Sequence, residues 1–170
     1  WKGQLELLEA FIDYSKTNKK SYLIIAGSPL FENDKYFNKI KKIIFDNKIE
    51  KQVKMPGYIF NIKDYLSSLD LYVQPSKAKD TTPLSLLSSL AIGLPVIISK
   101  IESFDEMLKY LPYIDRFKVS DKNELIKLLI KYEDQTIREK VGLDNRNNSF
   151  KFFDISVHGE EFLKIIKKLV

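Results

Sequence analysis

The chain of 170 residues lacks several features that would narrow its chemistry. It has no cysteine, which excludes disulfide bonds and cysteine-ligated metal sites. Its single histidine, His158, lies near the C-terminal end, where an exposed or capping role is favoured over catalysis. The sequence shows no signal peptide and no apolar run near the roughly 18 residues that span a bilayer. It also has no Gly-rich phosphate loop and no Ser-His-Asp arrangement. We therefore expect a cytoplasmic protein without a metal cofactor.

The excess of basic residues is small. There are 28 basic and 23 acidic residues, giving a formal net charge of +5. The lysines are spread along helical segments such as 35–48 and 162–170, a pattern typical of solvated helix faces. The alternatives are attraction to a nucleotide or to an anionic membrane, which would place the protein peripherally at the inner membrane face. No basic cluster is interleaved with aromatic residues, so nucleic-acid binding is not expected.

The most informative stretch of the sequence is residues 71–99. Tyr72 and Val73 form a short apolar strand that Pro75 ends. Thr82 suits a helix N-cap and Pro83 the first helical position, where a missing N–H costs nothing. Gly93 and Pro95 then end the helix, and the β-branched residues 96–98 are typical of a buried parallel strand. This pattern predicts a βαβ unit. Open parallel sheets bind ligands at the carboxyl ends of such strands, against helix N–H groups, and phosphate is the natural candidate.

The rest of the chain alternates strands with helices, which predicts an α/β fold with a doubly wound, Rossmann-like parallel sheet in one domain, residues 1–170. Because a helix that opens such a domain normally follows a strand, we expect a first strand upstream of residue 1. The expected strands are 21–27, 52–55, 72–73, 96–98 and 116–119. The expected helices are 4–15, 35–47, 61–68, 83–92, 103–110, 121–132, 135–147 and 157–170.

Several motifs, in order along the whole chain, resemble the C-terminal nucleotide-sugar-binding domain of GT-B glycosyltransferases, more narrowly of family 4, the "group 1" enzymes. They are Lys2-Gly3 with LLEAF (7–11), IIAG (24–27), V-x-x-x-G-Y (53–58), LDLYVQPS (69–76), PLSLLSSLAIGLPVI (83–97) and Glu106. The last two long motifs, in register, are fairly specific. The resemblance implies the C-terminal half of a GT-B fold, with an N-terminal acceptor domain outside these residues.

The resemblance also implies a function. Family members transfer a sugar from a nucleoside diphosphate sugar to an acceptor, with retention of the configuration at the anomeric carbon. For this chain the resemblance implies a glycan or lipid-linked acceptor and a role in surface polysaccharide biosynthesis. Lys2 matches a lysine that binds the diphosphate, where an ammonium suits the charge that builds on the leaving group. The helix start at Pro83 and Leu84 adds N–H donors. Tyr58 and Ile59 fall in the loop that seats the base. The main catalytic groups are expected in the N-terminal domain, so the isolated chain is expected to be inactive.

One signature of the family is altered in this chain. Two glutamates eight positions apart, which contact the donor, are replaced by Asp80 and Ser88, with Thr81 and Thr82 following Asp80. Asp80 can still accept hydrogen bonds from sugar hydroxyls, and Ser88 can bond a ribose hydroxyl without charge assistance. Each also has a plain structural interpretation: Asp80 as a cap or loop residue, and Ser88 as a close-packing position.

Two other functions remain open. A non-catalytic family member with a degenerate motif would serve as a nucleotide-binding or scaffolding subunit. A flavodoxin-like regulatory domain would present a different phosphate loop and begin with its own first strand.

Overall fold

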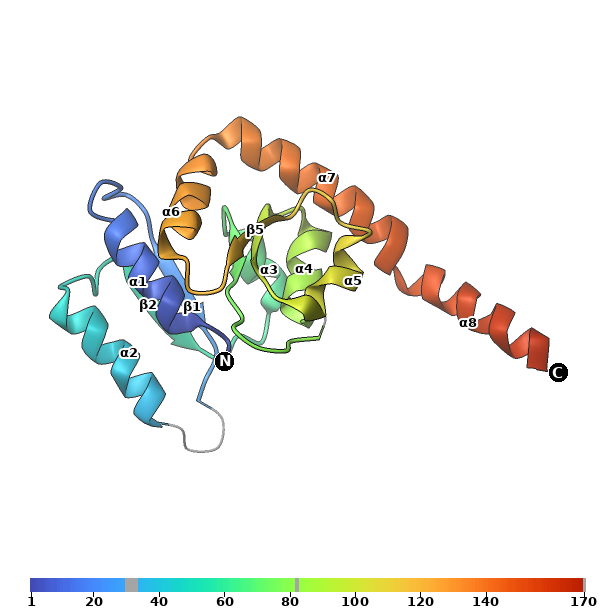
Figure 1. Ribbon diagram of the computed structural model, residues 1–170, viewed down its shortest axis with the longest axis horizontal. Helices are drawn as coiled ribbons and strands as arrows, with labels where there is room; N and C mark the ends of the chain where they lie inside the picture. Colours follow the sequence, from blue (N-terminus) through green and yellow to red (C-terminus); the bar gives the residue numbers. More distant parts are fainter. Residues whose placement is uncertain (30–33, 82, 170) are drawn as a thin grey trace.

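The computed structural model describes residues 1–29, 34–81 and 83–169 of the chain (Figure 1). Its strands are β1 (Leu23–Ala26), β2 (Val53–Gly57), β3 (Tyr72–Gln74), β4 (Val96–Lys100) and β5 (Asp115–Lys118). The helices are α1 (Gln4–Tyr14), α2 (Asp34–Asp46), α3 (Ile62–Ser67), α4 (Leu84–Ile92), a 3-10 turn (Glu102–Phe104), α5 (Asp105–Leu108), α6 (Lys122–Lys131), α7 (Gln135–Phe153) and α8 (Ile155–Leu169). This confirms the predicted α/β class.

All the strand pairs in the described residues are parallel, as predicted. β1 pairs with β2, while β3, β4 and β5 form a second sheet in that order. Residues 72–74 lie opposite 96–98, and residues 97–100 lie opposite 115–118. The sequence predicted one continuous sheet, and the described strands instead form two neighbouring parts, because β1 and β3 are not paired with each other.

Strand β4 shows how the sheet separates two cores. Val96 and Ile98 point into a cluster built from α4, α5 and the segment around Leu111. Ile97, between them, joins the other cluster, which includes residues of α1, α2, β1, β2 and α6. Side chains of a strand alternate between the two faces, so a strand that is apolar at every position must be covered on both. The run of residues 96–98 is fully buried for this reason.

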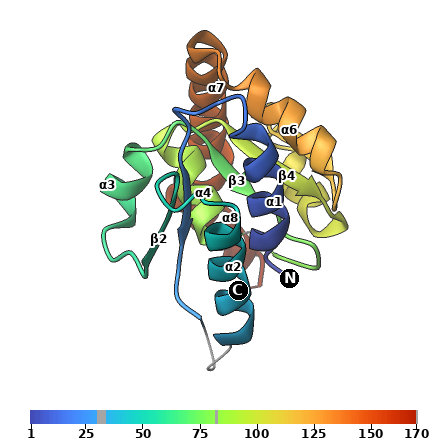
Figure 2. The same cartoon turned by 90° about the vertical axis from the view of Figure 1, so that its left-hand side faces the viewer.

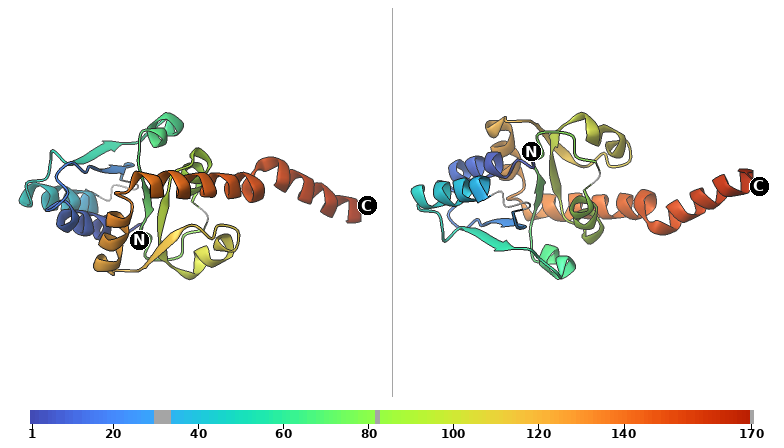
Figure 3. Two further views of the ribbon diagram at one scale, coloured as in Figure 1. Left: turned by 90° about the horizontal axis from the view of Figure 1, so that it is seen from above. Right: turned by 90° about the horizontal axis from the view of Figure 1, so that it is seen from below.

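Helices cover both faces of the strands (Figure 2). α1, α2 and α6 lie on one face, and α3, α4 and α7 lie on the other. A close approach of α7 to the end of α4 requires glycine: a Cβ on Gly142 would lie 2.0 Å from the Gly93 carbonyl oxygen. Gly93 itself ends α4 at φ 92°, as predicted. Figure 3 shows α8 continuing beyond α7 and projecting away from the body of the protein.

Three predicted boundaries differ from the structure. Pro83 is the N-cap of α4 rather than its first helical residue, so the helix begins at Leu84. Helix α6 begins at Lys122 rather than at 121, because the Asp121 carboxylate caps it and accepts from the Glu124 N–H at 2.9 Å; Ser120, which precedes this cap, has a φ of 65°. Strand β2 continues beyond the predicted end at 55 and includes Pro56, which an edge strand tolerates because one side needs no N–H donor.

Candidate functional site

The N-terminal segment is fixed beside the end of β3. The Lys77 N–H donates to the Trp1 carbonyl oxygen at 2.8 Å. Gly3 has a φ of 75°, and a Cβ on it would lie 1.8 Å from the Pro75 carbonyl oxygen. Only glycine accommodates both the left-handed backbone and this approach. Gly3 therefore places Lys2, which precedes it, at the carboxyl end of the sheet.

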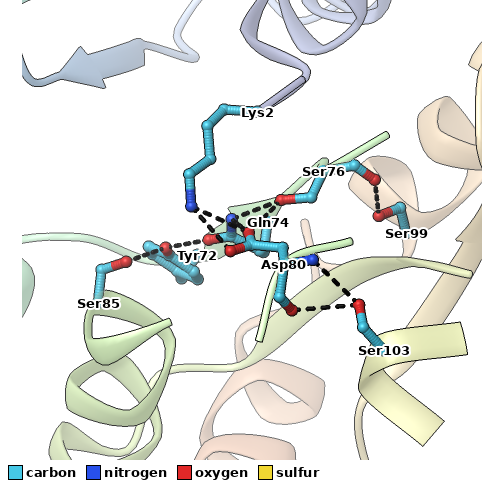
Figure 4. A network of polar contacts seen from close by, with 8 residues as sticks. All are labelled: Lys2, Tyr72, Gln74, Ser76, Asp80, Ser85, Ser99 and Ser103. Carbon is cyan, nitrogen blue, oxygen red and sulfur yellow. Dashed lines mark hydrogen bonds and ion pairs between the residues drawn. The ribbon is translucent and has the colours of Figure 1, made fainter. Parts of the chain in front are cut away.

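The Lys2 ammonium meets the carboxylate of Asp80, from the loop after β3 (Figure 4). Lys2 Nζ lies 2.9 Å from Asp80 Oδ1 and 3.0 Å from Oδ2. Asp80 is only 6% exposed, whereas the Lys2 side chain is 37% exposed. The Lys2 ammonium also lies 4.1 Å from the centre of the Trp1 ring, a cation–π contact. One side of the Lys2 ammonium is thus held by protein while the side chain still reaches solvent.

Two further side chains donate to the same carboxylate. Gln74 Nε2 lies 3.0 Å and Ser76 Oγ 2.5 Å from Asp80 Oδ2. Gln74 also donates to Ser76 Oγ at 2.8 Å. A buried carboxylate is stable only when its oxygens accept hydrogen bonds, and here both do. The loop of residues 75–80 is therefore closed around Asp80.

The network continues to the neighbouring elements (Figure 4). The Asp80 N–H donates to Ser103 Oγ at 3.1 Å, and the Ser103 hydroxyl donates to the Asp80 carbonyl. Ser99 of β4 donates to the Ser76 carbonyl. These contacts connect the loop of Asp80 to β4 and to the turn before α5, which fixes its position at the edge of the sheet.

Tyr72 links the network to α4. Its hydroxyl lies 2.5 Å from Gln74 Oε1 and 2.8 Å from Ser85 Oγ (Figure 4). Burial raises the pKa of Tyr72 to about 12, the Ser85 hydrogen bond opposes this shift, and the Asp80 charge adds to it. The phenol is therefore neutral at physiological pH and acts as a hydrogen-bond donor to Gln74.

A cleft of about 860 Å³ begins at Lys2 and runs between β1 and β3. Tyr58 and Ile59 line it, as does Gly27 after β1. Tyr58 is 68% exposed, and its ring packs edge-on against Phe60 at 5.0 Å. Ile62 also lines the cleft and is exposed there. The structure thus brings Lys2, Tyr58 and Ile59 to one cleft.

The start of α4 is open. Leu84 is 80% exposed and Thr81 is also exposed, while the Pro83 carbonyl accepts from the N–H groups of Leu86 and Leu87. The N–H groups of Leu84 and Ser85 have no acceptor within the helix, which gives this end of α4 the partial positive charge of a helix N-terminus. The predicted cap Thr82 lies outside the described residues.

The two altered signature positions are not equivalent in the structure. Ser88 is half-buried, one turn after Leu84, whereas the Asp80 carboxylate is buried and bonded to Lys2, Gln74 and Ser76. The predicted sugar and ribose contacts of these two residues remain predictions. Sequence reasoning missed Gln74, Ser76, Ser99 and Ser103 as partners. For Gln74, Ser76 and Ser99 the signal was a polar residue at or just after the end of a buried strand, where it needs a partner; Ser103, in the 3-10 turn, gave no such signal.

The described residues contain no group of three or more histidine, cysteine or acidic side chains positioned to hold a metal ion. No helix within residues 1–29, 34–81 and 83–169 is both long and apolar enough to cross a membrane.

Residues 1–142 match the family of glycosyl transferases group 1. The chain belongs to this family. No match was found among the curated proteins. The group 1 match includes Lys2, the Asp80 network and α4, so the whole candidate site lies within the residues that match the family.

Solved structures show the same fold. HepE from Anabaena, in complex with UDP and glucose, matches 98% of this chain with a TM-score of 0.88 and 19% identity. The C-terminal domain of a group 1 glycosyl transferase, LpcC from Francisella tularensis, matches 91% with a TM-score of 0.80 and 20% identity. TarM from S. aureus matches 96% with a TM-score of 0.83 and 18% identity. The chain spans 45% of HepE, 80% of the LpcC domain and 32% of TarM.

Proposed function

We propose that this chain is the donor-binding half of a retaining glycosyltransferase of family 4, and that it holds a nucleoside diphosphate sugar at the carboxyl end of its strands. The observation that carries the proposal is the position of the Lys2 ammonium, at the mouth of the cleft that Tyr58 and Ile59 line. The structures of HepE and TarM contain UDP, which supports a uridine nucleotide as the first ligand to test.

The chemistry of the site suits a diphosphate. Lys2 uses Asp80 as a counter-ion, yet its side chain still reaches solvent. The N-terminal N–H groups of α4 add a partial positive charge, worth about 0.3–1 kcal/mol for an anion at an exposed site. Charge accumulates on the diphosphate as the glycosidic bond breaks, so these groups would stabilise the leaving group. We propose that no metal is needed, that an N-terminal domain supplies the glycan or lipid-linked acceptor, and that the product is a surface polysaccharide.

The state of Asp80 also favours a second candidate, a non-catalytic nucleotide-binding subunit. Both oxygens of the Asp80 carboxylate already accept bonds from protein side chains, and Ser88 carries no carboxylate. Oδ2 accepts from three donors and Oδ1 from Lys2 alone, so a sugar hydroxyl could bond only to Oδ1 unless it displaced a protein donor. Assay of the full-length protein for sugar transfer and for slow donor hydrolysis separates the two candidates, because only an enzyme releases the nucleoside diphosphate.

Trp1 provides a direct test of nucleotide binding. It is the only tryptophan of the chain, and its ring contacts the Lys2 ammonium. Titration with UDP, GDP and ADP, with Trp1 fluorescence as the readout, should give a saturable change in the millimolar range for at least one of them. The absence of any saturable change, by fluorescence and by calorimetry, contradicts the proposal.

Variants of two lysines show whether the signal comes from the proposed site. Lys2→Met keeps the aliphatic stem and removes the charge, and we expect it to weaken nucleotide binding by about fivefold to tenfold, since one charge-assisted contact contributes about 1–1.4 kcal/mol here. Lys127→Met is the matched control, because Lys127 is exposed on α6 and is not among the residues that line the cleft. Equal affinities of the two variants would remove Lys2 from the site.

A further inference from the structure

A continuous chain of hydrogen-bonded side chains joins the Lys2 ammonium to the start of α4. From Lys2 it passes through Asp80, Gln74 and Tyr72 to Ser85, the second residue of α4 (Figure 4). The successive distances are 2.9, 3.0, 2.5 and 2.8 Å. Asp80 and Gln74 are buried, whereas Ser85 is exposed and lines the cleft. The chain therefore leads from a buried carboxylate to a hydroxyl group that a ligand can reach.

The direction of each hydrogen bond in this chain follows from the chemistry of its groups. The Asp80 carboxylate only accepts, so Gln74 must turn its amino group toward Asp80 and its carbonyl oxygen toward Tyr72. The Gln74 oxygen carries no proton, so the Tyr72 hydroxyl donates its single proton to that oxygen. Burial raises the pKa of Tyr72 to about 12, so this proton is present at physiological pH. The bond between Tyr72 and Ser85 then needs the Ser85 proton, which makes Ser85 the donor.

This direction leaves the Ser85 hydroxyl able only to accept from a ligand. Its proton is committed to Tyr72, and no donor among the described residues occupies the Ser85 oxygen. The Ser85 N–H, in contrast, lies at the positive end of α4 and can donate to an anion. An ionised phosphate oxygen suits the N–H, but the hydroxyl oxygen would repel it because neither oxygen has a proton to share. Ser85 thus offers the cleft one donor and one acceptor for different parts of a ligand.

We propose that the Ser85 hydroxyl oxygen accepts a hydrogen bond from a carbohydrate hydroxyl of the bound ligand, on the ribose or on the donor sugar. The inference rests on the proposed function, because it needs a nucleoside diphosphate at this cleft. In a nucleotide sugar these two sugars are bonded directly to the diphosphate, so their hydroxyls are the donors nearest to a phosphate at the start of α4. Tyr72 and Gln74 are positioning residues in this account, because they fix the direction of the Ser85 proton.

Calorimetric titration of the native protein and of Ser85→Ala tests the proposal. The ligands are UDP, its 2′-deoxy and 3′-deoxy forms, and UDP-glucose; if GDP or ADP is the nucleotide that binds, the same series is made with it. If a ribose hydroxyl is the donor, Ser85→Ala should weaken UDP binding about threefold to tenfold and leave the affinity for the deoxy form that lacks this hydroxyl unchanged. If a glucose hydroxyl is the donor, the same loss should appear with UDP-glucose and not with UDP. Either result supports the proposal and identifies the sugar.

Ser67→Ala is the matched control and should bind every ligand as the native protein does. Ser67 is exposed on α3, its hydroxyl donates to the Lys63 carbonyl oxygen at 2.9 Å, and it is not among the residues that line the cleft. An equal loss with all four ligands in Ser85→Ala would show that the Ser85 hydroxyl donates to phosphate, and no loss with any ligand would show that it makes no contact. Both outcomes overturn the inference and leave the proposed function intact. The absence of any nucleotide binding by the native protein overturns both.

Gln74→Met tests the direction of the chain without a change at Ser85. The variant removes the acceptor of the Tyr72 proton, so the Tyr72 hydroxyl can donate to Ser85 and occupy its oxygen. We expect the preference for the ligand that carries the critical hydroxyl over the ligand that lacks it to fall by about twofold or more. A general loss of packing would weaken both ligands alike and leave this preference at its native value. An unchanged preference therefore overturns the assigned direction and the inference with it.

Discussion

Replacement of Asp80 is the sharpest probe of the polar network, because its hydrogen-bond partners differ in exposure. Gln74 and Ser76 are buried, and both donate to Oδ2 of the carboxylate. Lys2 donates to both oxygens but is 37% exposed. Removal of Asp80 therefore leaves two buried donors without that acceptor, whereas the Lys2 ammonium can return to water.

The magnitudes follow from this difference. Asp80→Ala removes the acceptor for both buried donors, and each loss costs about 1–3 kcal/mol. Because Gln74 keeps its bond to Ser76, we expect a total cost of about 2–4 kcal/mol. Asp80→Asn keeps an oxygen for Gln74 and Ser76 and loses the charge and the second acceptor oxygen toward Lys2. Because Lys2 is 37% exposed and can return to water, the expected cost is about 1 kcal/mol.

Urea unfolding of the native protein and the two variants measures both costs. In thermal unfolding, each kcal/mol should lower Tm by about 2–4 °C for a domain of this size. Equal destabilisation by alanine and asparagine would show that the charge pairing, not acceptance from Gln74 and Ser76, is the main contribution. A cost below about 1 kcal/mol for Asp80→Ala would refute the reasoning that the network is closed against water.

Three other predictions follow from the same structure. Gly3→Ala should destabilise the chain by more than about 2 kcal/mol in the urea assay, because the φ of Gly3 is positive and a Cβ would meet the Pro75 carbonyl. The control is Gly159→Ala on α8, where a Cβ would meet open space, and it should be neutral or stabilising in the same assay. The pKa of Tyr72 is about 12 in the folded state and 10.0 in the unfolded state, so the unfolded state loses this proton first as the pH rises. The free energy of unfolding of the native protein should therefore be unaffected by Tyr72 below pH 10, and should fall relative to that of Tyr72→Phe by about 1.4 kcal/mol per pH unit between about pH 10 and pH 12. Denaturant titrations at each pH measure this difference, and parallel plots of unfolding free energy against pH for the two proteins would contradict it. Nucleotide affinity should be unchanged by EDTA, as measured by calorimetry, since Lys2 and the start of α4 supply the positive charge; loss of binding on chelation would show that a metal ion is required.

The sequence predicted the class of fold because each signal was local. The apolar run 96–98 indicated a strand covered on both faces, and Gly93 with Pro95 marked the end of α4. These features depend on residues that are neighbours in the chain, and the structure confirms them. The positions of caps were less certain, since Ser120 and Asp121 are both good capping residues, and only the backbone decides between them.

The site was predictable in part. The family motifs indicated Lys2 and Asp80 separately, but their direct contact spans 78 positions of sequence and depends on how Gly3 packs against Pro75. The division of the sheet could not be predicted either. Local patterns show which segments form strands, whereas the choice of which strands pair depends on packing between segments that are distant in the chain.

The most direct test of nucleotide binding at this cleft is to map the binding site by NMR. Titration of the ¹⁵N-labelled chain with UDP should shift the backbone amides of Lys2, Gly27, Tyr58, Leu84 and Ser85 together, with one apparent affinity, because these residues surround the mouth of the cleft and the start of α4. Saturable shifts confined to another surface, or no shifts at millimolar UDP, GDP and ADP, would contradict a nucleotide site at the carboxyl end of these strands.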